Sequence, residues 1–199
     1  MRPDLEIVAG LVAPGSRVLD LDCGDGQLLA HLIAERGCRG TGVDSDPAAL
    51  ISAIRRGVPV IDLDLDTQLG EFADASYDLV VVSQTLQATQ HPALVLGEIA
   101  RIAGRGVVSV PNFGLWKHRV QLLARGRMPV SAELPRPWYD TPNIHLATLR
   151  DLEDLFETCG FAVTERVLLD AHGRASAGLR SRGPANLLAS GAVYLVQAG

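Results

Sequence analysis

The chain has 199 residues, long enough for one domain with a sizeable hydrophobic core. Hydrophobic residues make up 47% of it and charged residues 21%, a balance that excludes an intrinsically disordered chain. Acidic residues outnumber basic ones by 23 to 18, and the basic residues are scattered along the chain. This distribution argues against a nucleic-acid or anionic-membrane binder.

Short apolar runs alternate with amphipathic stretches over the first 111 residues, a pattern typical of βαβ units in a parallel sheet. We expect strands at residues 17–21, 40–44, 58–63, 79–83 and 106–110. Helices are predicted at 26–36, 47–56 and 92–102, the first ended by a glycine and the second started by an aspartate and a proline. Right-handed crossovers then place helices on both faces of the sheet.

Residues 111–145 differ in composition, because they hold five of the 11 prolines and four of the nine aromatic residues. A helix is expected only within 115–125, and the insertion as a whole is predicted to be a ligand lid or a partner surface. After it we expect a helix at 149–159, strands at 161–168 and 192–196, and a mobile loop at 171–191. Residues 1–199 are thus predicted to form a single domain.

Residues 18–27 (VLDLDCGDGQ) form a glycine-rich turn between the first strand and the first helix, where nucleotide-type ligands bind. Gly24 and Gly26 fit the first two positions of the dinucleotide pattern GxGxxG, but a leucine occupies the third. The turn also carries three carboxylates, at Asp20, Asp22 and Asp25. These would repel a pyrophosphate and attract ammonium and sulfonium groups, so the loop predicts a site for S-adenosylmethionine (SAM).

Asp44 closes the second strand twenty residues after Gly24, where an acid in such folds accepts hydrogen bonds from the ribose hydroxyls. We assign Asp44 and the neighbouring Ser45 to the cofactor site. The alternative is that Asp44 only begins the next helix, although Asp46 is a better cap for it.

Asp64 and Leu65 follow the third strand, where a side chain and the backbone can read an adenine edge. Residues 62–66 also alternate as a solvent-facing strand end would, so both interpretations stay open. Ser83, at the end of the fourth strand, is added to the cofactor-binding set because ligands bind at the carboxyl ends of such strands.

Other reactive residues carry weaker signals. Cys23 is assigned to the ligand loop as a small side chain packing under the turn rather than as a nucleophile. Tyr139 and His145 are the candidate general bases near the expected methyl-acceptor space. The five histidines lack metal-ligand spacing and the three cysteines lack a CxxC pair, so we expect no metal and a reduced, cytoplasmic protein.

The loop, the acid after the second strand and Tyr77–Val80 are similar to class I SAM-dependent methyltransferases. Further stretches resemble one family, the methionine biosynthesis protein MetW. They are residues 83–88 (SQTLQA), 109–114 (SVPNFG) with Trp116, and 126–130 (GRMPV) running on to 138–145 (WYDTPNIH). The opening MRPDL matches too, and the similarity covers roughly residues 1–170.

The resemblance implies an α/β fold of the class I SAM-methyltransferase type, a Rossmann-like three-layer sandwich whose seven-stranded sheet is mostly parallel, with its last strand reversed. It also implies a cytoplasmic protein of methionine synthesis that works with a homoserine O-acetyl- or O-succinyltransferase of the α/β-hydrolase fold. The family loop usually reads Leu-Gly-Cys-Gly. Asp22 stands here in place of its first glycine, and we expect weaker binding of SAM.

Two functions follow. The first is an accessory or regulatory subunit for homoserine acylation that binds SAM or S-adenosylhomocysteine (SAH). The second is a SAM-dependent methyltransferase acting on a small metabolite, because methyl transfer to a good nucleophile needs little beyond in-line positioning.

Overall fold

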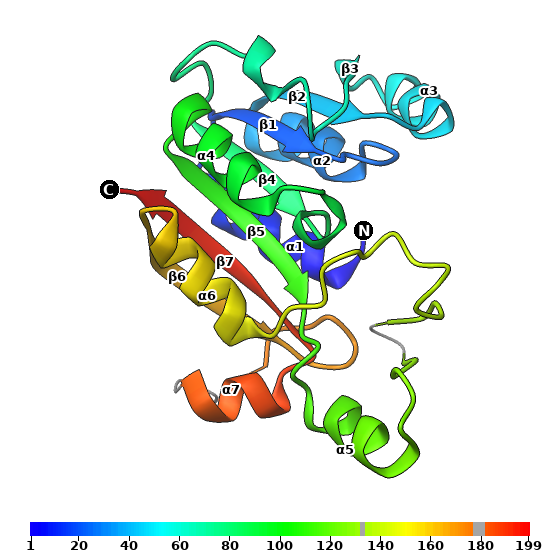
Figure 1. Cartoon of the computed structure of the whole chain (residues 1–199). Coiled ribbons are helices and arrows are strands. Elements are labelled where there is room, and N and C mark those ends of the chain that lie inside the picture. The colour runs from blue at the N-terminus through cyan, green and yellow to red at the C-terminus, as the bar shows by residue number, and fades with distance from the viewer. Residues whose placement is uncertain (132–133, 177–181) are drawn as a thin grey trace.

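The computed structural model describes residues 1–131, 134–176 and 182–199. Its centre is a seven-stranded sheet in the order β3-β2-β1-β4-β5-β7-β6 (Figure 1). The strands are β1 (Arg17–Leu21), β2 (Arg39–Asp44), β3 (Val60–Asp62), β4 (Leu79–Ser83), β5 (Arg105–Pro111), β6 (Phe161–Leu169) and β7 (Gly191–Ala198). The pairs among β1 to β5 are parallel, and β7 runs antiparallel to both β5 and β6. This is the predicted topology, including the reversed last strand.

Helices cover both faces of the sheet and make it the middle of three layers (Figure 1). One face carries α1 (Pro3–Leu11), α2 (Gln27–Arg36) and α3 (Pro47–Arg55), and the other carries α4 (Pro92–Ile102) and α6 (Leu149–Thr158). The chain also forms α5 (Trp116–Arg125), α7 (Arg182–Leu188) and the short 3-10 helices η1 (Leu69–Glu71) and η2 (Leu86–Ala88). In Figure 1, α5, in the first part of the insertion 111–145, stands away from the sheet.

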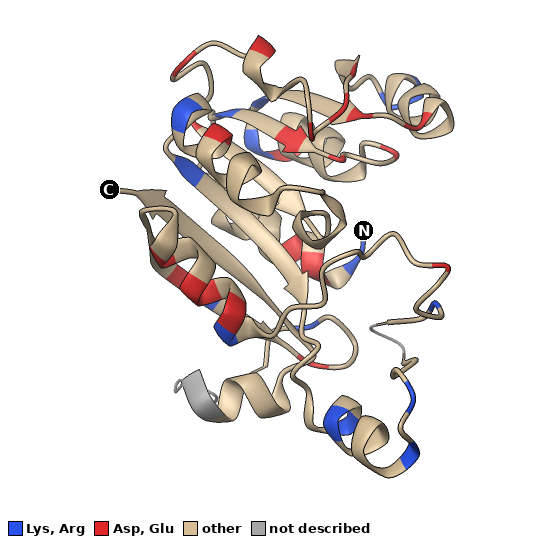
Figure 2. Ribbon diagram, in the orientation of Figure 1, with Lys and Arg blue, Asp and Glu red and all other residues tan. Residues whose placement is uncertain are grey.

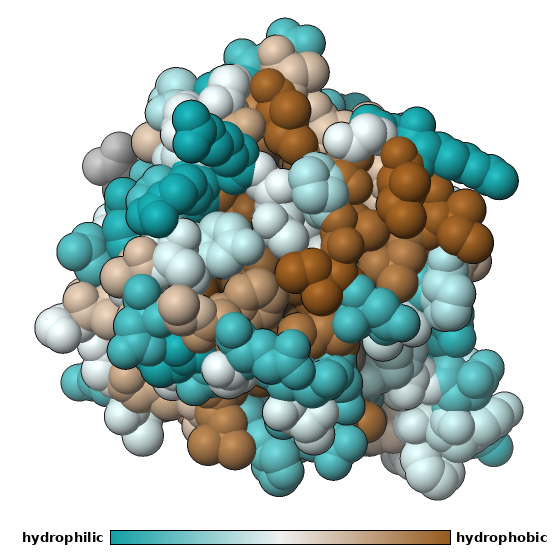
Figure 3. All heavy atoms as spheres, turned by 90° about the horizontal axis from the view of Figure 1, so that it is seen from above, coloured by the Kyte–Doolittle hydropathy of each residue, from teal (hydrophilic) through white to brown (hydrophobic). Residues whose placement is uncertain are grey.

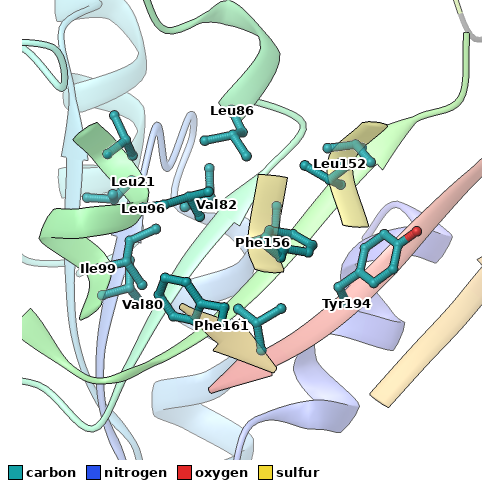
Figure 4. Packing of buried hydrophobic residues seen from close by; sticks show 14 of the residues in the cluster. Leu21, Val80, Val82, Leu86, Leu96, Ile99, Leu152, Phe156, Phe161 and Tyr194 are labelled. Atoms are coloured by element: carbon teal, nitrogen blue, oxygen red, sulfur yellow. The ribbon is translucent and has the colours of Figure 1, made fainter. Parts of the chain in front are cut away.

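Each face of the sheet has its own hydrophobic core. On the α4 and α6 side, Leu96 and Ile99 pack with Val80 and Val82, while Phe156 meets Tyr194 edge to face at 5.4 Å (Figure 4). On the α1 and α2 side, the core is formed by smaller side chains from the helices and the opposite strand faces. Because the central strands are buried on both faces, they read in the sequence as continuous apolar runs, which is why they were predictable.

Three elements differ from the sequence-based expectations. The third strand was expected at 58–63 but is only Val60–Asp62, because the Val58 N–H completes the end of α3 by donating to the Ala53 carbonyl. The helix Pro3–Leu11 was not predicted, although a proline in its first turn and two early acids are helix-start signals.

The segment 171–191, expected to be a mobile loop, is corrected at residues 182–188, which form α7. The core contacts of Ala185 and Ala189 hold this helix in place, and such contacts outweigh a weak local propensity. Residues 177–181 of the expected loop lie outside the described residues.

β3 forms one edge of the sheet and pairs with β2 only through Val60–Asp62. Exposed hydrophobic side chains near it are Ile51 and Ile54 on α3 and Ile61 on β3. Figure 3 views the molecule from this end and shows hydrophobic side chains toward one side of the face, with hydrophilic ones around them.

Candidate functional site

The glycine loop after β1 turns through left-handed backbone conformations. Gly24 and Gly26 have φ values of 56° and 73°, which glycine adopts without cost. A Cβ on Gly26 would lie 2.9 Å from the Cβ of Ala53, so close packing of α2 against α3 also requires this glycine. A Cβ on Gly24 would meet nothing within 4 Å, so the loop has free space at this position.

Cys23 is a packing residue of this loop. Its side chain is buried, and a Cβ added to Gly42 on β2 would fall 2.5 Å from its sulfur. Burial, together with the carboxyl groups nearby, raises the pKa of the Cys23 thiol to about 12. The thiol therefore stays protonated at neutral pH, which agrees with the packing interpretation rather than with a nucleophile.

Asp44 ties the loop to the end of β2. One carboxylate oxygen accepts the Gly24 N–H at 2.8 Å and the other accepts the Asp46 N–H at 2.8 Å. The side chain is buried, yet each carboxylate oxygen has further acceptor capacity. Asp44 is thus a structural clamp that joins the glycine loop to the start of α3.

Asp22 has a φ of 63°, so the residue in place of the family glycine does adopt the left-handed conformation. Its carboxylate accepts a hydrogen bond from the Thr85 hydroxyl at 2.7 Å, which links the glycine loop to the loop after β4. Although the residue is exposed overall, partial burial of its carboxyl group raises its pKa. The Thr85 hydrogen bond opposes this rise, and the nearby Asp44 carboxylate adds to it.

Asp20 is the most perturbed acid of the site. It is buried near the end of β1, and burial followed by the proximity of Asp22 and Asp44 raises its pKa to about 8. The Arg2 guanidinium acts in the opposite direction. The Asp22 and Asp44 carboxylates thus disfavour the charged form of Asp20, and a cationic ligand in the site would relieve this repulsion.

A cleft of about 480 Å³ lies beside these acids. It is lined by Arg2, Leu5, Asp20, Asp22, Cys23, Gly24, Asp25, Gln27, Leu28, Ser83 and Gln84. The Asp25 carboxylate is paired with the Arg56 guanidinium at 2.6 Å, and the Ser83 hydroxyl is 3.1 Å from that of Ser109. The structure thus brings Ser83 together with the predicted loop residues Asp20, Asp22, Cys23 and Gly24.

Five of the predicted cofactor residues are not on the lining of this cleft. Gly26 and Asp44 lie in and beside the glycine loop, and the other three follow β2 and β3. Ser45 is exposed directly after Asp44. The Asp64 carboxylate accepts the N–H of Asp66 two residues on, and Leu65 packs on the core. They stand at the same edge of the sheet as Asp44, because β3 runs parallel to β2.

The two candidate bases also lie away from the cleft lining. Tyr139 is 75% exposed and packs edge to face on Trp138. The backbone N–H of His145 donates to the Gln87 carbonyl, and its Nε2 is 3.3 Å from the Gln90 carbonyl. Neither imidazole nor phenol is positioned beside the acids of the loop.

A second cavity, of about 310 Å³, opens between η2, α6 and the segment that returns from α5. Its lining is mostly apolar and includes Leu86, Val110, Phe113, Leu134, Leu152 and Leu155, with His145 among the few polar members. Since β4 and β5 end next to it, this cavity lies at the carboxyl ends of the parallel strands, as the glycine loop does.

Sequence reasoning missed the contributions of Arg2, Gln84 and Thr85. Gln84 has a φ of 60°, and its amide donates to the buried Asp4 carboxylate at 3.1 Å. The family-like strings MRPDL and SQTLQA contained these residues, but nothing in the sequence placed them beside the glycine loop.

Within the described ranges, no group of three or more His, Cys, Asp or Glu side chains is arranged to hold a metal ion. The described helices are also too short or too polar to cross a membrane.

The strand order, the antiparallel β7 and the acidic glycine loop define the class I SAM-dependent methyltransferase fold. A methyltransferase from Thermotoga maritima, described as a possible histamine N-methyltransferase, superposes with a TM-score of 0.70 at 18% identity, over 99% of this chain and 88% of that one. A SAM-dependent methyltransferase from Mesorhizobium loti gives 0.69 at 18% identity, over 98% and 96%. These likenesses concern the fold.

The family is defined by sequence. Residues 2–196 match the methionine biosynthesis protein MetW, and the chain belongs to this family. It is 33% identical over 176 residues to the bifunctional methionine biosynthesis protein MetXA/MetW of Rhodopirellula baltica, a match that spans 84% of this chain and 28% of that protein. The chain thus spans less than half the length of the curated relatives that it matches.

Proposed function

We propose that the chain binds SAM or SAH in the cleft beside the glycine loop. The residues present fit such a ligand, because the loop has free space at Gly24. The carboxyl groups of Asp20, Asp22 and Asp44 lie close together beside it and favour a cation. Asp44 would accept the ribose hydroxyls, and Ser45, Asp64 and Leu65 would flank the adenine. When bound, SAM supplies a sulfonium-activated methyl group.

Calorimetric titration with SAH tests this proposal. We expect saturable binding of SAH and no binding of NAD, whose pyrophosphate the loop carboxylates would repel. Absence of SAH binding, or preference for NAD, would contradict the assignment of the cleft.

We further propose that the chain acts as an accessory subunit of a homoserine O-acyltransferase. The observation that carries this role is the bifunctional relative, in which a MetW part and a MetXA part share one polypeptide. Two activities fused in one protein often correspond to separate chains that associate. The three cysteines of this chain are free thiols, as a cytoplasmic complex would have them.

The surface offered to such a partner is the insertion of residues 111–145, called the arm below. On α5, Trp116, Val120 and Leu123 are 44%, 52% and 90% exposed at spacings of four and three residues. That spacing aligns them in one stripe on the helix, a pattern typical of helices that dock into an apolar groove.

The arm is also basic in an acidic protein. It carries five of the chain's 18 basic residues and two of its 23 acidic ones. Figure 2 shows basic residues on α5 and just after it, whereas α6 is lined with acidic residues. We therefore expect the partner to offer an apolar groove with an acidic rim.

Co-expression of the chain with the homoserine O-acyltransferase tests the arm. Leu123→Ala or Trp138→Ala should weaken the complex about thirtyfold or more if the residue is a central anchor. Leu94→Ala is the matched control, because Leu94 is a 65% exposed leucine on α4, outside the arm. Equal complex formation by folded Leu123→Ala and Leu94→Ala proteins would remove α5 from the interface.

A second candidate function is catalytic methyl transfer to a small metabolite. The apolar cavity at the ends of β4 and β5 favours it, since an acceptor could be held there at the same carboxyl end of the strands as the glycine loop. Conversion of SAM to SAH that depends on a small-molecule extract, and that Ala93→Phe in the cavity lining abolishes, would support it. A partner-dependent acyltransferase effect without SAH formation would favour the accessory role.

A further inference from the structure

The cleft beside the glycine loop has an uneven charge balance. Three aspartates line it, and one of them, Asp25, is already paired with Arg56. Arg2 is the one basic side chain among the lining residues in the described part of the chain. It lies near enough to Asp20 and Asp22 to favour their charged forms.

The local sequence determines where Arg2 points. A residue before proline is confined to extended backbone, and Arg2, before Pro3, has φ −62° and ψ 145°. The helix that follows is anchored at its first turn by the buried Asp4, which accepts a hydrogen bond from the Gln84 amide. Its next turns pack into the core through Val8.

The guanidinium is held from one side only. Its Nη2 donates to the Ser83 hydroxyl at 3.3 Å and lies 3.4 Å from the Asp4 carboxylate. Within the described residues, all of these contacts use Nη2, so the Nε–H and Nη1–H₂ donors face no protein acceptor. With its side chain 54% exposed, Arg2 keeps an open planar edge toward the cleft.

Open edges of this kind bind carboxylates. A guanidinium presents two parallel N–H groups that match the two oxygens of a carboxylate. The aspartates of the same cleft suit the opposite charge. The lining therefore has separate places for a carboxylate and for an ammonium group, as a zwitterionic amino acid requires.

We propose that Arg2 binds the α-carboxylate of the methionine half of the ligand, while Asp20 faces its α-ammonium group. This inference rests on the proposed binding of SAM or SAH in the cleft. It goes further in making the cleft selective for the amino-acid half of the ligand, through a residue that precedes the first helix.

The test compares two ligands that differ in this half. SAH carries the amino-acid end, whereas 5′-methylthioadenosine has the same nucleoside and thioether without the carboxylate and the ammonium. We expect Arg2→Gln to weaken SAH binding about tenfold or more and to leave 5′-methylthioadenosine binding unchanged. Arg2→Lys should lie between, because it keeps the charge but lacks the planar fork.

Arg39→Gln is the matched control, since Arg39 is an exposed arginine at the start of β2, at the other end of the sheet from the loop. It should bind both ligands as the unaltered protein does. Equal losses for both ligands in Arg2→Gln, together with a lower melting temperature, would reduce Arg2 to a structural anchor of α1 and overturn the inference.

Unchanged SAH affinity in Arg2→Gln would overturn the inference while the proposed function stood. If the unaltered protein bound neither ligand, the proposed function would fail and the inference with it. Binding of 5′-methylthioadenosine as tightly as SAH would keep an adenosyl site but contradict recognition of the amino-acid half.

Discussion

Asp22→Gly restores the glycine that the family usually has at this turn, and its effects can be worked out from the structure. A side chain at φ 63° carries strain of about 1–2 kcal/mol, which glycine would relieve. Against this, glycine costs about 0.5–1 kcal/mol in chain entropy.

The substitution also removes the hydrogen bond from Thr85, worth about 0.5–1.5 kcal/mol net. The Thr85 hydroxyl still has an acceptor in this variant, because it lies 3.2 Å from the Ser83 carbonyl oxygen. The terms nearly cancel. We therefore expect stability to change by no more than about 1 kcal/mol, or about 2–4 °C in melting temperature.

Ligand affinity should change more than stability. Asp22 lines the cleft, so its β-carbon and carboxylate would occupy space beside the methionine end of a ligand bound as proposed above. Removing them should tighten SAM binding by about one order of magnitude, equivalent to about 1.4 kcal/mol. Calorimetry on the unaltered protein, Asp22→Gly and Asp22→Asn measures this.

Asp22→Asn is the informative companion, because it keeps the β-carbon and an acceptor for Thr85 but removes the charge. If crowding dominates, the Asn variant should bind like the unaltered protein and only the Gly variant should gain. Equal or weaker binding by Asp22→Gly would refute the reasoning and make Asp22 an accommodated ligand contact.

Three further predictions concern the same loop. The pKa of Asp20 is raised to about 8, so between about pH 4 and pH 8 the folded state keeps a proton that the unfolded state has lost. The free energy of unfolding of the ligand-free protein should therefore fall as pH rises through this range, by at most about 1.4 kcal/mol per pH unit. Urea unfolding between pH 5.5 and 7.5 should show a smaller fall for Asp20→Asn than for the unaltered protein. The same slope in both proteins would contradict the prediction. Asp44→Ala should weaken SAH binding at least tenfold and should also lower the melting temperature, because the Gly24 N–H loses its acceptor. An unchanged SAH affinity in calorimetry would exclude Asp44 from the site. Gly26→Ala should destabilise the protein by about 1–3 kcal/mol in urea unfolding, through its positive φ and the 2.9 Å approach to Ala53, and an unchanged midpoint would show that the helices can separate.

The sequence alone determined the elements whose signals are local. The strand at 79–83 and the helix at 92–102 begin and end as predicted, because a buried apolar run and a proline at the first helical position mark them directly. The glycine loop and the acid at the end of β2 were placed for the same reason. Strand, turn and helix lie within about ten residues, and parallel pairing brings the next strand's end alongside.

Only the tertiary structure decided what the loop faces. Thr85 lies 63 residues from Asp22, and Ser83 lies 81 residues from Arg2, yet hydrogen bonds join both pairs. Neither hydrophobic periodicity nor a local turn signal predicts contacts between residues so far apart in the sequence. They depend on how β4 ends beside β1 and on how α1 packs across the sheet, which is settled by burial of apolar surface summed over the whole chain. The acids of the site could therefore be predicted from the sequence, whereas the arginine that balances their charge could not.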